Sequence, residues 1–192
     1  MRKIIASEFL TVDGVMEDPG GAEKSKHGGW AFQFERGPEG DKVKFDELMA
    51  ADALLLGRKT YEGFAVAWPS IKDEAGFAER MNGLPKYVVS TTLKEANWNN
   101  SRIISSNVAD EVSKLKQQPG QDILIAGSGQ LIRSLMDDDL VDEFRLMLYP
   151  VVLGTGKRLF TEGNYATLKL VEAKPLSSGI MLMRYEPDRK AK

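Results

Sequence analysis

Leu54-Leu55-Leu56-Gly57-Arg58-Lys59-Thr60-Tyr61-Glu62 and Ile123-Leu124-Ile125-Ala126-Gly127-Ser128-Gly129-Gln130 are the two stretches that decide the fold of this chain. In each, an apolar run ends at a glycine and a helix-like stretch begins at once. This pattern predicts a buried strand that turns directly into a helix, with free backbone N–H groups at the helix N-terminus. Such N–H groups bind phosphate. Two junctions of this kind fit one extended, multiply charged ligand better than two small anions, so they indicate a nucleotide cofactor.

The composition limits the classes of function. A length of 192 residues predicts one domain, residues 1–192, with a proper hydrophobic core. The net charge of -2 argues against nucleic-acid or membrane-surface binding. The chain has no cysteine and a single histidine, His27, so neither a metal site nor a catalytic triad is expected. The sequence shows no signal peptide and no membrane-spanning run, and we expect a cytoplasmic protein.

The order of the expected elements indicates an α/β fold. Alternating strands and helices are followed by a strand-rich last third, which predicts a three-layer α/β/α domain with a mostly parallel central sheet and an antiparallel C-terminal hairpin. The expected strands are 2–10, 53–56, 87–90, 102–105, 123–126, 143–153, 167–173 and 180–185. The expected helices are 41–51, a helix from residue 58, 108–118 and 130–137. The segment 16–40 is expected to be a functional or mobile loop, because loops of that length are uncommon in compact domains.

The first junction carries unusual charges. Arg58 and Lys59 begin a helix where the helix dipole is already positive, which is unfavourable unless an anion binds there. Thr60 adds a hydroxyl donor. The alternative is a tight turn at Gly57 with solvated cations.

The second junction resembles only the start of a dinucleotide fingerprint. A third glycine belongs where this chain has Ile132, so Gly127 and Gly129 predict a close backbone approach to a ligand and not the full motif. Ser90 and Thr91 follow another expected strand, in the kind of position where an acidic residue selects NAD. Hydroxyl groups there favour NADP, although the same residues can cap a local turn.

The remaining candidates are carboxylates and aromatic residues. Asp13 precedes Gly14 and reads as a turn, whereas Asp41 opens a helix, where it can compensate the dipole or relay a proton to a heterocycle. No nucleophile elbow, P-loop or hydrolase pair of carboxylates is present. Hydride transfer fits this set of residues best, because the cofactor supplies the reactive atom and the protein supplies position.

These residues resemble a known family. The resemblance rests on the two glycine junctions and on three further segments, Thr11-Val12-Asp13-Gly14-Val15, Lys86-Tyr87-Val88-Val89-Ser90 and Leu148-Tyr149-Pro150-Val151-Val152-Leu153-Gly154-Thr155-Gly156. In kind and order these segments are similar to those of the dihydrofolate-reductase-like superfamily. The specific resemblance is to the RibD C-terminal domain of bacterial bifunctional deaminase–reductases. It extends over nearly the whole chain, and Gly-Arg-Lys-Thr-Tyr-Glu is its most specific part.

The resemblance implies an NADPH site and a neighbouring substrate site. Phosphates would be held by Gly57, Arg58, Lys59 and Thr60, and Ser90 with Thr91 would lie near the 2′-phosphate. The pyrophosphate and nicotinamide ribose would lie on Gly127, Ser128, Gly129 and Gln130. Ala6 would contact the nicotinamide through its backbone, and the Asp13-Gly14 turn would cover the reacting face. Asp41 is the candidate for the catalytic acid, and Trp30, Phe34 and Phe45 are candidates for packing on the substrate ring.

The predicted function is therefore an NADPH-dependent reductase that acts on a pyrimidine- or pteridine-like heterocycle or its ribityl derivative. The enzyme it resembles is 5-amino-6-(5-phosphoribosylamino)uracil reductase of riboflavin biosynthesis, but this chain lacks the cysteines of the zinc deaminase half. The alternatives are a dihydrofolate reductase and a non-catalytic NADPH-binding module. A homodimer is also expected, because residues 143–153 form a long apolar strand whose exposed edge would need cover. The competing interpretation places that strand inside the sheet.

Overall fold

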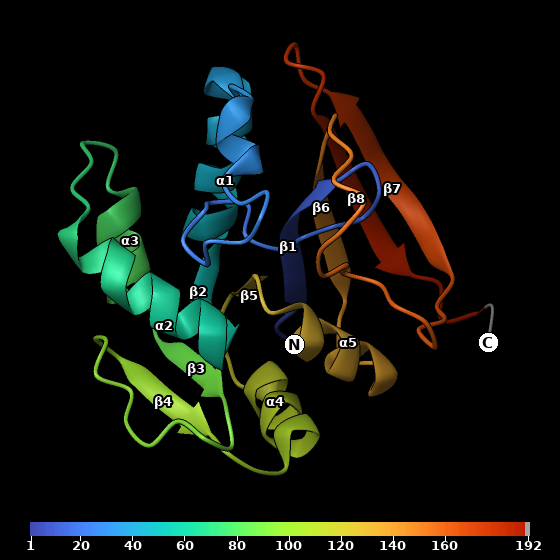
Figure 1. The fold of residues 1–192 in the computed structure, drawn as a ribbon. Coiled ribbons are helices and arrows are strands. Elements are labelled where there is room, and N and C mark those ends of the chain that lie inside the picture. The colour runs from blue at the N-terminus through green and yellow to red at the C-terminus, as the bar shows by residue number, and fades with distance from the viewer. Residues whose placement is uncertain (191–192) are drawn as a thin grey trace.

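The fold is known from a computed structural model, which describes residues 1–190. The eight strands form one sheet, and Figure 1 shows helices on both of its faces. The elements in chain order are β1 (Ile4–Thr11), the 3-10 turn η1 (Trp30–Gln33), α1 (Gly37–Ala50), β2 (Ala51–Gly57), α2 (Arg58–Ala67), η2 (Trp68–Ser70), α3 (Phe77–Gly83), β3 (Lys86–Val89), β4 (Ser101–Ile104), α4 (Val108–Gln117), β5 (Asp122–Ala126), α5 (Gly129–Asp137), β6 (Glu143–Tyr149), β7 (Leu168–Pro175) and β8 (Met181–Pro187).

The sheet has the strand order β4-β3-β2-β5-β1-β6-β8-β7. All neighbours from β4 to β6 are parallel, whereas β8 runs antiparallel to both β6 and β7. The predicted fold class, with its mostly parallel sheet and antiparallel C-terminal hairpin, is confirmed. Strand β5 lies between β1 and β2, so the two strands that come first in the chain are separated by one that comes much later.

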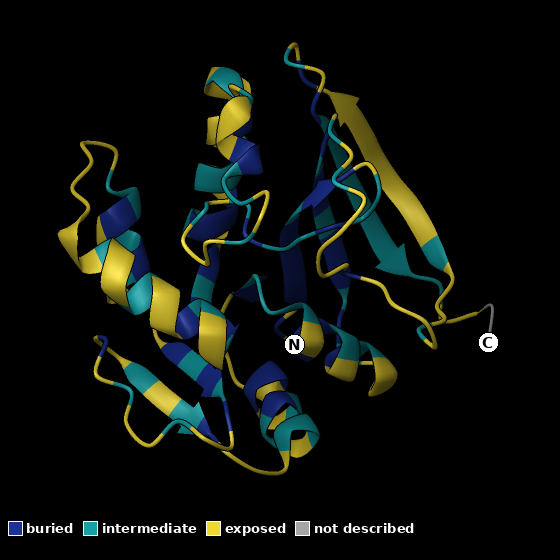
Figure 2. Cartoon of the chain, in the orientation of Figure 1, coloured by how far each residue is buried: buried dark blue, intermediate teal, exposed yellow. Residues whose placement is uncertain are grey.

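The interior has three buried clusters, and strand periodicity places two of them on opposite faces of the central strands. Successive side chains point to opposite faces of a strand, and a strand buried on both faces is apolar throughout. Ile5, Leu54, Leu56 and Leu124 pack with residues of α1, α2 and α3 on one face. Ile4, Leu55, Ile123 and Ile125 pack with residues of α4 and α5 on the other face. Figure 2 shows the buried centre and the exposed β7 at one edge.

The segment between β1 and α1 is a packed structure. Asp18 is buried, and its carboxylate accepts the N–H groups of Glu23 and Ser25 at 2.9 Å each. Its carbonyl oxygen accepts the N–H of Gly29, also at 2.9 Å. Helix α1 begins at Gly37, four residues before the predicted start, because Pro38 stands in its first turn, where proline is favoured. These contacts give most of the predicted 16–40 loop a fixed path.

Strand β6 is an interior strand. It pairs with β1 on one side and with β8 on the other, so it has no exposed edge. The reason given for a homodimer is therefore wrong, because that reason depended on an open edge at residues 143–153. The edge strands of the sheet are β4 and β7. Within residues 1–190, no helix has the length and apolar character needed to cross a membrane.

Candidate functional site

The two glycine junctions meet at one edge of the sheet. Strands β2 and β5 are parallel neighbours, so their carboxyl ends and the helices that follow them lie together. The N–H of Gly57 donates to Ser128 Oγ at 2.7 Å, and this hydroxyl donates to Thr60 Oγ1 at 2.9 Å. One serine therefore joins the start of α2 to the start of α5.

The two turns lie so close together that a side chain on Gly57 or Gly127 would collide with the other turn. A Cβ on Gly57 would lie 2.8 Å from Ser128 Oγ, and one on Gly127 would lie 3.0 Å from the Thr60 side chain. Gly127 and Ser128 also have left-handed backbone, with φ of 86° and 77°. The sequence predicted a close approach of this backbone to a ligand. In the structure, the glycines also allow the two turns to approach each other closely.

Both helices begin without a side-chain cap. Within residues 1–190, no side chain accepts a first-turn N–H of α2 or α5 as a cap. The Ser128 hydroxyl would be the expected cap of α5, but it is already bonded to Gly57 and Thr60. Two helix N-termini with free N–H groups therefore lie side by side, and their dipoles add positive potential at one place.

The charged residues of the first junction are exposed. Arg58 forms an ion pair with Glu62 one turn later, with Nη1 and Oε1 3.1 Å apart. This pairing relieves part of the unfavourable charge that the sequence suggested an anion would neutralise. Lys59 and Gln130 are exposed on the first turns of α2 and α5. Their contact with a cofactor stays a prediction.

Ser90 and Thr91 follow β3, the strand next to β2. Ser90 Oγ accepts the N–H groups of Thr92 at 3.2 Å and Leu93 at 2.9 Å, so this hydroxyl caps a local turn. Thr91 is exposed. The turn lies at the same sheet edge as the two glycine junctions, and its contact with a 2′-phosphate stays a prediction.

A buried carboxyl group lies behind the second junction. Glu8, on β1, is 4% exposed, and its Oε1 accepts the N–H of Gly127 at 2.8 Å. Burial raises the pKa of Glu8 to about 8, against the opposing effects of this hydrogen bond and of the Lys44 charge. Glu8 is not among the site residues predicted from the sequence. The sequence signal for Glu8 is a carboxylate in the middle of a mostly apolar strand.

A second polar cluster links β1 to α1. Ser7 Oγ donates to Glu47 Oε2 at 2.7 Å, and Lys44 Nζ lies 2.7 Å from the same carboxylate oxygen and also donates to Ser7. Ser7 and Glu47 are buried, and Lys44 Nζ lies 5.2 Å from the centre of the Phe9 ring. This cluster, too, was not predicted from the sequence. Ala6, beside Ser7, is fully buried in the sheet.

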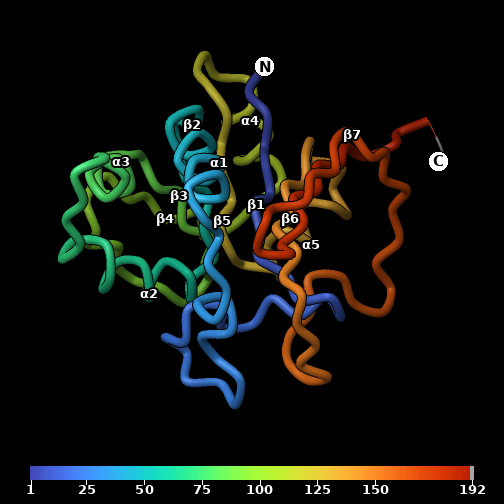
Figure 3. The backbone as a smooth tube through the Cα atoms, turned by 90° about the horizontal axis from the view of Figure 1, so that it is seen from above, coloured from blue at the N-terminus to red at the C-terminus, as the bar shows by residue number. Residues whose placement is uncertain are grey.

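The Asp13-Gly14 turn is tied to the loop after β6. The Asp13 carboxylate accepts the Thr11 hydroxyl at 2.6 Å and the N–H groups of Leu153 and Gly154 at 3.2 and 2.9 Å. The Thr11 hydroxyl, with the two N–H groups, lowers the pKa of Asp13. Figure 3 shows both loops on the same side of the molecule. Next to the turn, Met16 reaches Gly129, where an added Cβ would lie 2.4 Å from its sulfur atom.

Trp30 is part of the core, so its predicted role in packing on a substrate is wrong. Its side chain is 0% exposed, its Nε1 donates to the Glu17 carbonyl at 2.8 Å, and its ring meets Tyr149 edge-on at 5.3 Å. Phe34 is half-buried against the same Tyr149, at 5.9 Å between ring centres.

Asp41 and Phe45 lie on α1. The Asp41 side chain is 62% exposed and pairs with Arg36 at 2.9 Å. Phe45 is half-buried. The acidic group of α1 that contacts β1 is Glu47, through Ser7. A catalytic role for Asp41 and a substrate contact for Phe45 stay predictions.

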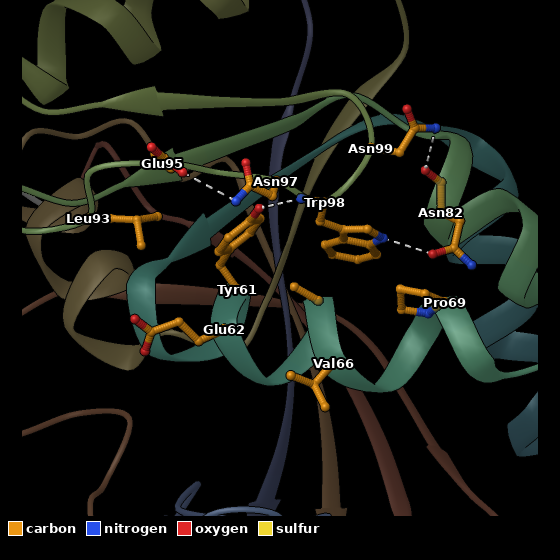
Figure 4. A pocket seen from close by; sticks show the side chains of 11 residues that line it. Tyr61, Glu62, Val66, Pro69, Asn82, Leu93, Glu95, Asn97, Trp98 and Asn99 are labelled. Carbon is orange, nitrogen blue, oxygen red and sulfur yellow. Dashed lines mark hydrogen bonds between the residues drawn. The ribbon is translucent and has the colours of Figure 1, made fainter.

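A shallow groove lies along α2, beside the segment 93–99 (Figure 4). Its polar groups bond to one another. Tyr61 Oη accepts the N–H of Trp98 at 2.9 Å, and Trp98 Nε1 donates to Asn82 Oδ1 at 2.8 Å. The buried Lys86 Nζ lies 4.1 Å from the Trp98 ring centre and donates to three backbone carbonyls. These groups of the groove wall form a structural network, and neither Gly57 nor Gly127 lines the groove.

Comparison with known proteins agrees with this geometry. The family model of the RibD C-terminal domain matches residues 2–182. The uncharacterized protein YyaP of Bacillus subtilis (strain 168) is 34% identical over 188 residues, which cover 96% of this chain and 94% of YyaP.

Two solved structures share the fold. A putative riboflavin biosynthesis protein from Shewanella sp. PV-4 has a TM-score of 0.76 at 19% identity, with 97% of this chain and 99% of that one covered. Dihydrofolate reductase from Enterococcus faecalis, complexed with NADP(H), has a TM-score of 0.61 at 13% identity, with 97% and 96% covered. The dihydrofolate-reductase-like architecture is thus confirmed, and the chain belongs to the RibD C-terminal domain family.

Proposed function

We propose that this protein is an NADPH-dependent reductase of a flat, polar heterocycle. The observation that carries the proposal is the pair of uncapped helix N-termini held together by Ser128 between Gly57 and Thr60. Their free N–H groups and dipoles suit the phosphates of a dinucleotide. Membership of the RibD C-terminal domain family and a fold shared with an NADP(H)-bound dihydrofolate reductase support the same choice.

Each group of residues at the site has its own proposed role. The first turns of α2 and α5 would hold the phosphates, and Arg58, Lys59 and Thr91 would favour a 2′-phosphate by charge and hydroxyl contact. NADPH supplies a hydride when it is bound. The Lys44–Ser7–Glu47 cluster would face the substrate, because it brings buried hydrogen-bonding groups to the level of the end of β5, where Ser7 pairs with Ala126 next to Gly127.

The substrate that we propose first is 5-amino-6-(5-phosphoribosylamino)uracil or a related ribityl compound. Arg36 and Lys44 both lie near the Phe9 ring, at 5.5 and 5.2 Å from its centre, and two cations beside an aromatic ring suit an oxygen-rich heterocycle. A dihydrofolate substrate is the other candidate. NADPH oxidation measured with each compound distinguishes them, and cofactor binding without turnover of either favours a non-catalytic module.

Cofactor binding is tested with a matched pair of variants. Arg58→Ala removes a cation that is 43% exposed, whereas Arg184→Ala removes one that is 41% exposed on β8. We expect Arg58→Ala to weaken NADPH binding about tenfold and NADH binding less than about threefold, since a charged contact contributes about 1 kcal/mol or more. Arg184→Ala should bind like the wild type. Fluorescence titration gives the dissociation constants, and equal losses for both cofactors would contradict the role of Arg58.

A further inference from the structure

The buried Glu8 carboxyl has an unusual position for an acid. It lies inside the sheet on β1, opposite the apolar Leu146 of β6, and within residues 1–190 its hydrogen-bond partner is the Gly127 N–H. The one charged group that acts on it from a neighbouring element is Lys44 of α1. No arginine or lysine forms an ion pair with it in the part of the chain that the structure describes.

The carboxyl also lies directly behind the proposed phosphate site. Gly127 precedes Ser128, the N-cap residue of α5, so Glu8 holds the backbone at the point where the turn begins. A negative charge here would neutralise the positive potential at the N-terminus of α5, and this potential is what attracts a phosphate. It would also repel the phosphate through the protein interior, where charges are weakly screened. A neutral carboxyl accepts the same N–H without either effect.

We propose that Glu8 is a positioning residue for the cofactor site, whose neutral carboxyl holds the Gly127 turn ready for a dinucleotide and whose ionised form weakens dinucleotide binding. This inference rests on the proposed function. Burial raises the pKa of Glu8 to about 8, so the change in charge falls in a range where binding is easily measured. The protein would then bind its cofactor with an affinity that declines in mildly alkaline solution.

The test is a series of NADPH titrations from about pH 6.5 to 9.5 at constant ionic strength, followed by cofactor fluorescence. Glu8→Gln keeps an oxygen that accepts the Gly127 N–H but has no charge to gain. Glu62→Gln is the control, because Glu62 is an exposed carboxylate near the same junction. We expect binding by the wild type and by Glu62→Gln to weaken about five- to tenfold between pH 7 and 9, and binding by Glu8→Gln to change less than about twofold.

A second measurement needs no variant. If NADPH favours the protonated carboxyl, its binding to the wild type at pH 8.5 must take up a fraction of a proton, which calorimetry in two buffers of different ionisation enthalpy detects. No uptake, or equal weakening in Glu8→Gln and the wild type, overturns the role of Glu8 and leaves the proposed function standing. Failure of NADPH to bind the wild type at any pH overturns both.

Discussion

Ser128 shows how one side chain fixes the relative position of two helices. Its hydroxyl accepts from Gly57 and donates to Thr60, and its backbone has a φ of 77°, which a residue with a Cβ adopts at some energetic cost. Serine at this position has the cost of the left-handed backbone and the gain of two hydrogen bonds. Glycine would remove the backbone strain but also both hydrogen bonds.

Two substitutions separate these effects. Ser128→Ala removes both hydrogen bonds and keeps the left-handed strain, so we expect a loss of about 2 kcal/mol in the free energy of unfolding. Ser128→Gly removes the bonds but relaxes the backbone, and we expect a loss of about 1 kcal/mol. Urea denaturation measures both. Equal losses would show that the backbone conformation contributes nothing at this position.

Glu8 makes the stability of the apo protein depend on pH. Its pKa is raised from 4.5 to about 8 in the folded protein, so the folded state keeps a proton that the unfolded chain has lost. Stability must therefore fall as the pH rises between these values, by at most about 1.4 kcal/mol per pH unit. We expect Glu8→Gln to remove this slope, and denaturation of both proteins at about pH 5, 6.5 and 8 tests it. Parallel curves would contradict the raised pKa.

Among the elements, the turn after β1 depends on a segment far along the chain. Asp13 connects it to the loop after β6 through Leu153 and Gly154, and Arg158 Nε donates to the Asp13 carbonyl at 2.9 Å. The turn that the resemblance placed over the reacting face is therefore held by a distant loop as well as by hydrogen bonds within residues 11–15.

Loss of this connection should loosen both loops together. Asp13→Ala removes three hydrogen bonds to a charged acceptor, and we expect about 2 kcal/mol of lost stability with faster amide exchange in residues 11–16 and 150–159. Asp13→Asn keeps an acceptor oxygen and should lie between the wild type and Asp13→Ala. Hydrogen–deuterium exchange by mass spectrometry measures each loop. Faster exchange in only one of them would contradict the coupling.

The elements that the sequence predicted correctly are those with a local signal. The apolar runs before Gly57 and Gly127 identified β2 and β5, and the glycines identified where they end. The predictions that were wrong or missing concern residues whose contacts are with partners distant in the chain. Trp30 is buried by Tyr149, and Ser7 meets Lys44 and Glu47 only because α1 packs on β1. Helix α3 had no strong periodicity and was not predicted.

At the scale of the whole molecule, stability should fall from the centre of the sheet towards β7. Strands β1, β2 and β5 contain residues that are fully buried, whereas every residue of β7 after Leu168 is exposed. We expect the amides of β5 to exchange only on global unfolding and those of β7 to exchange orders of magnitude faster. Native-state hydrogen exchange tests this, with sedimentation at micromolar concentration as the control. Strong protection of the β7 amides that point away from β8 would show that a second molecule covers this edge.

The place of β5 between β1 and β2 also constrains how the chain is made. Strand β1 pairs with β5 and β6 and with nothing nearer in sequence, so Ile4 has no sheet partner until Ile123 has been synthesised. During translation the first strand leaves the ribosome as an unpaired apolar segment, while β2, β3 and β4 are already able to pair. The end of the chain made first is thus among the last to find its place, and chaperones that hold nascent chains would act on this strand.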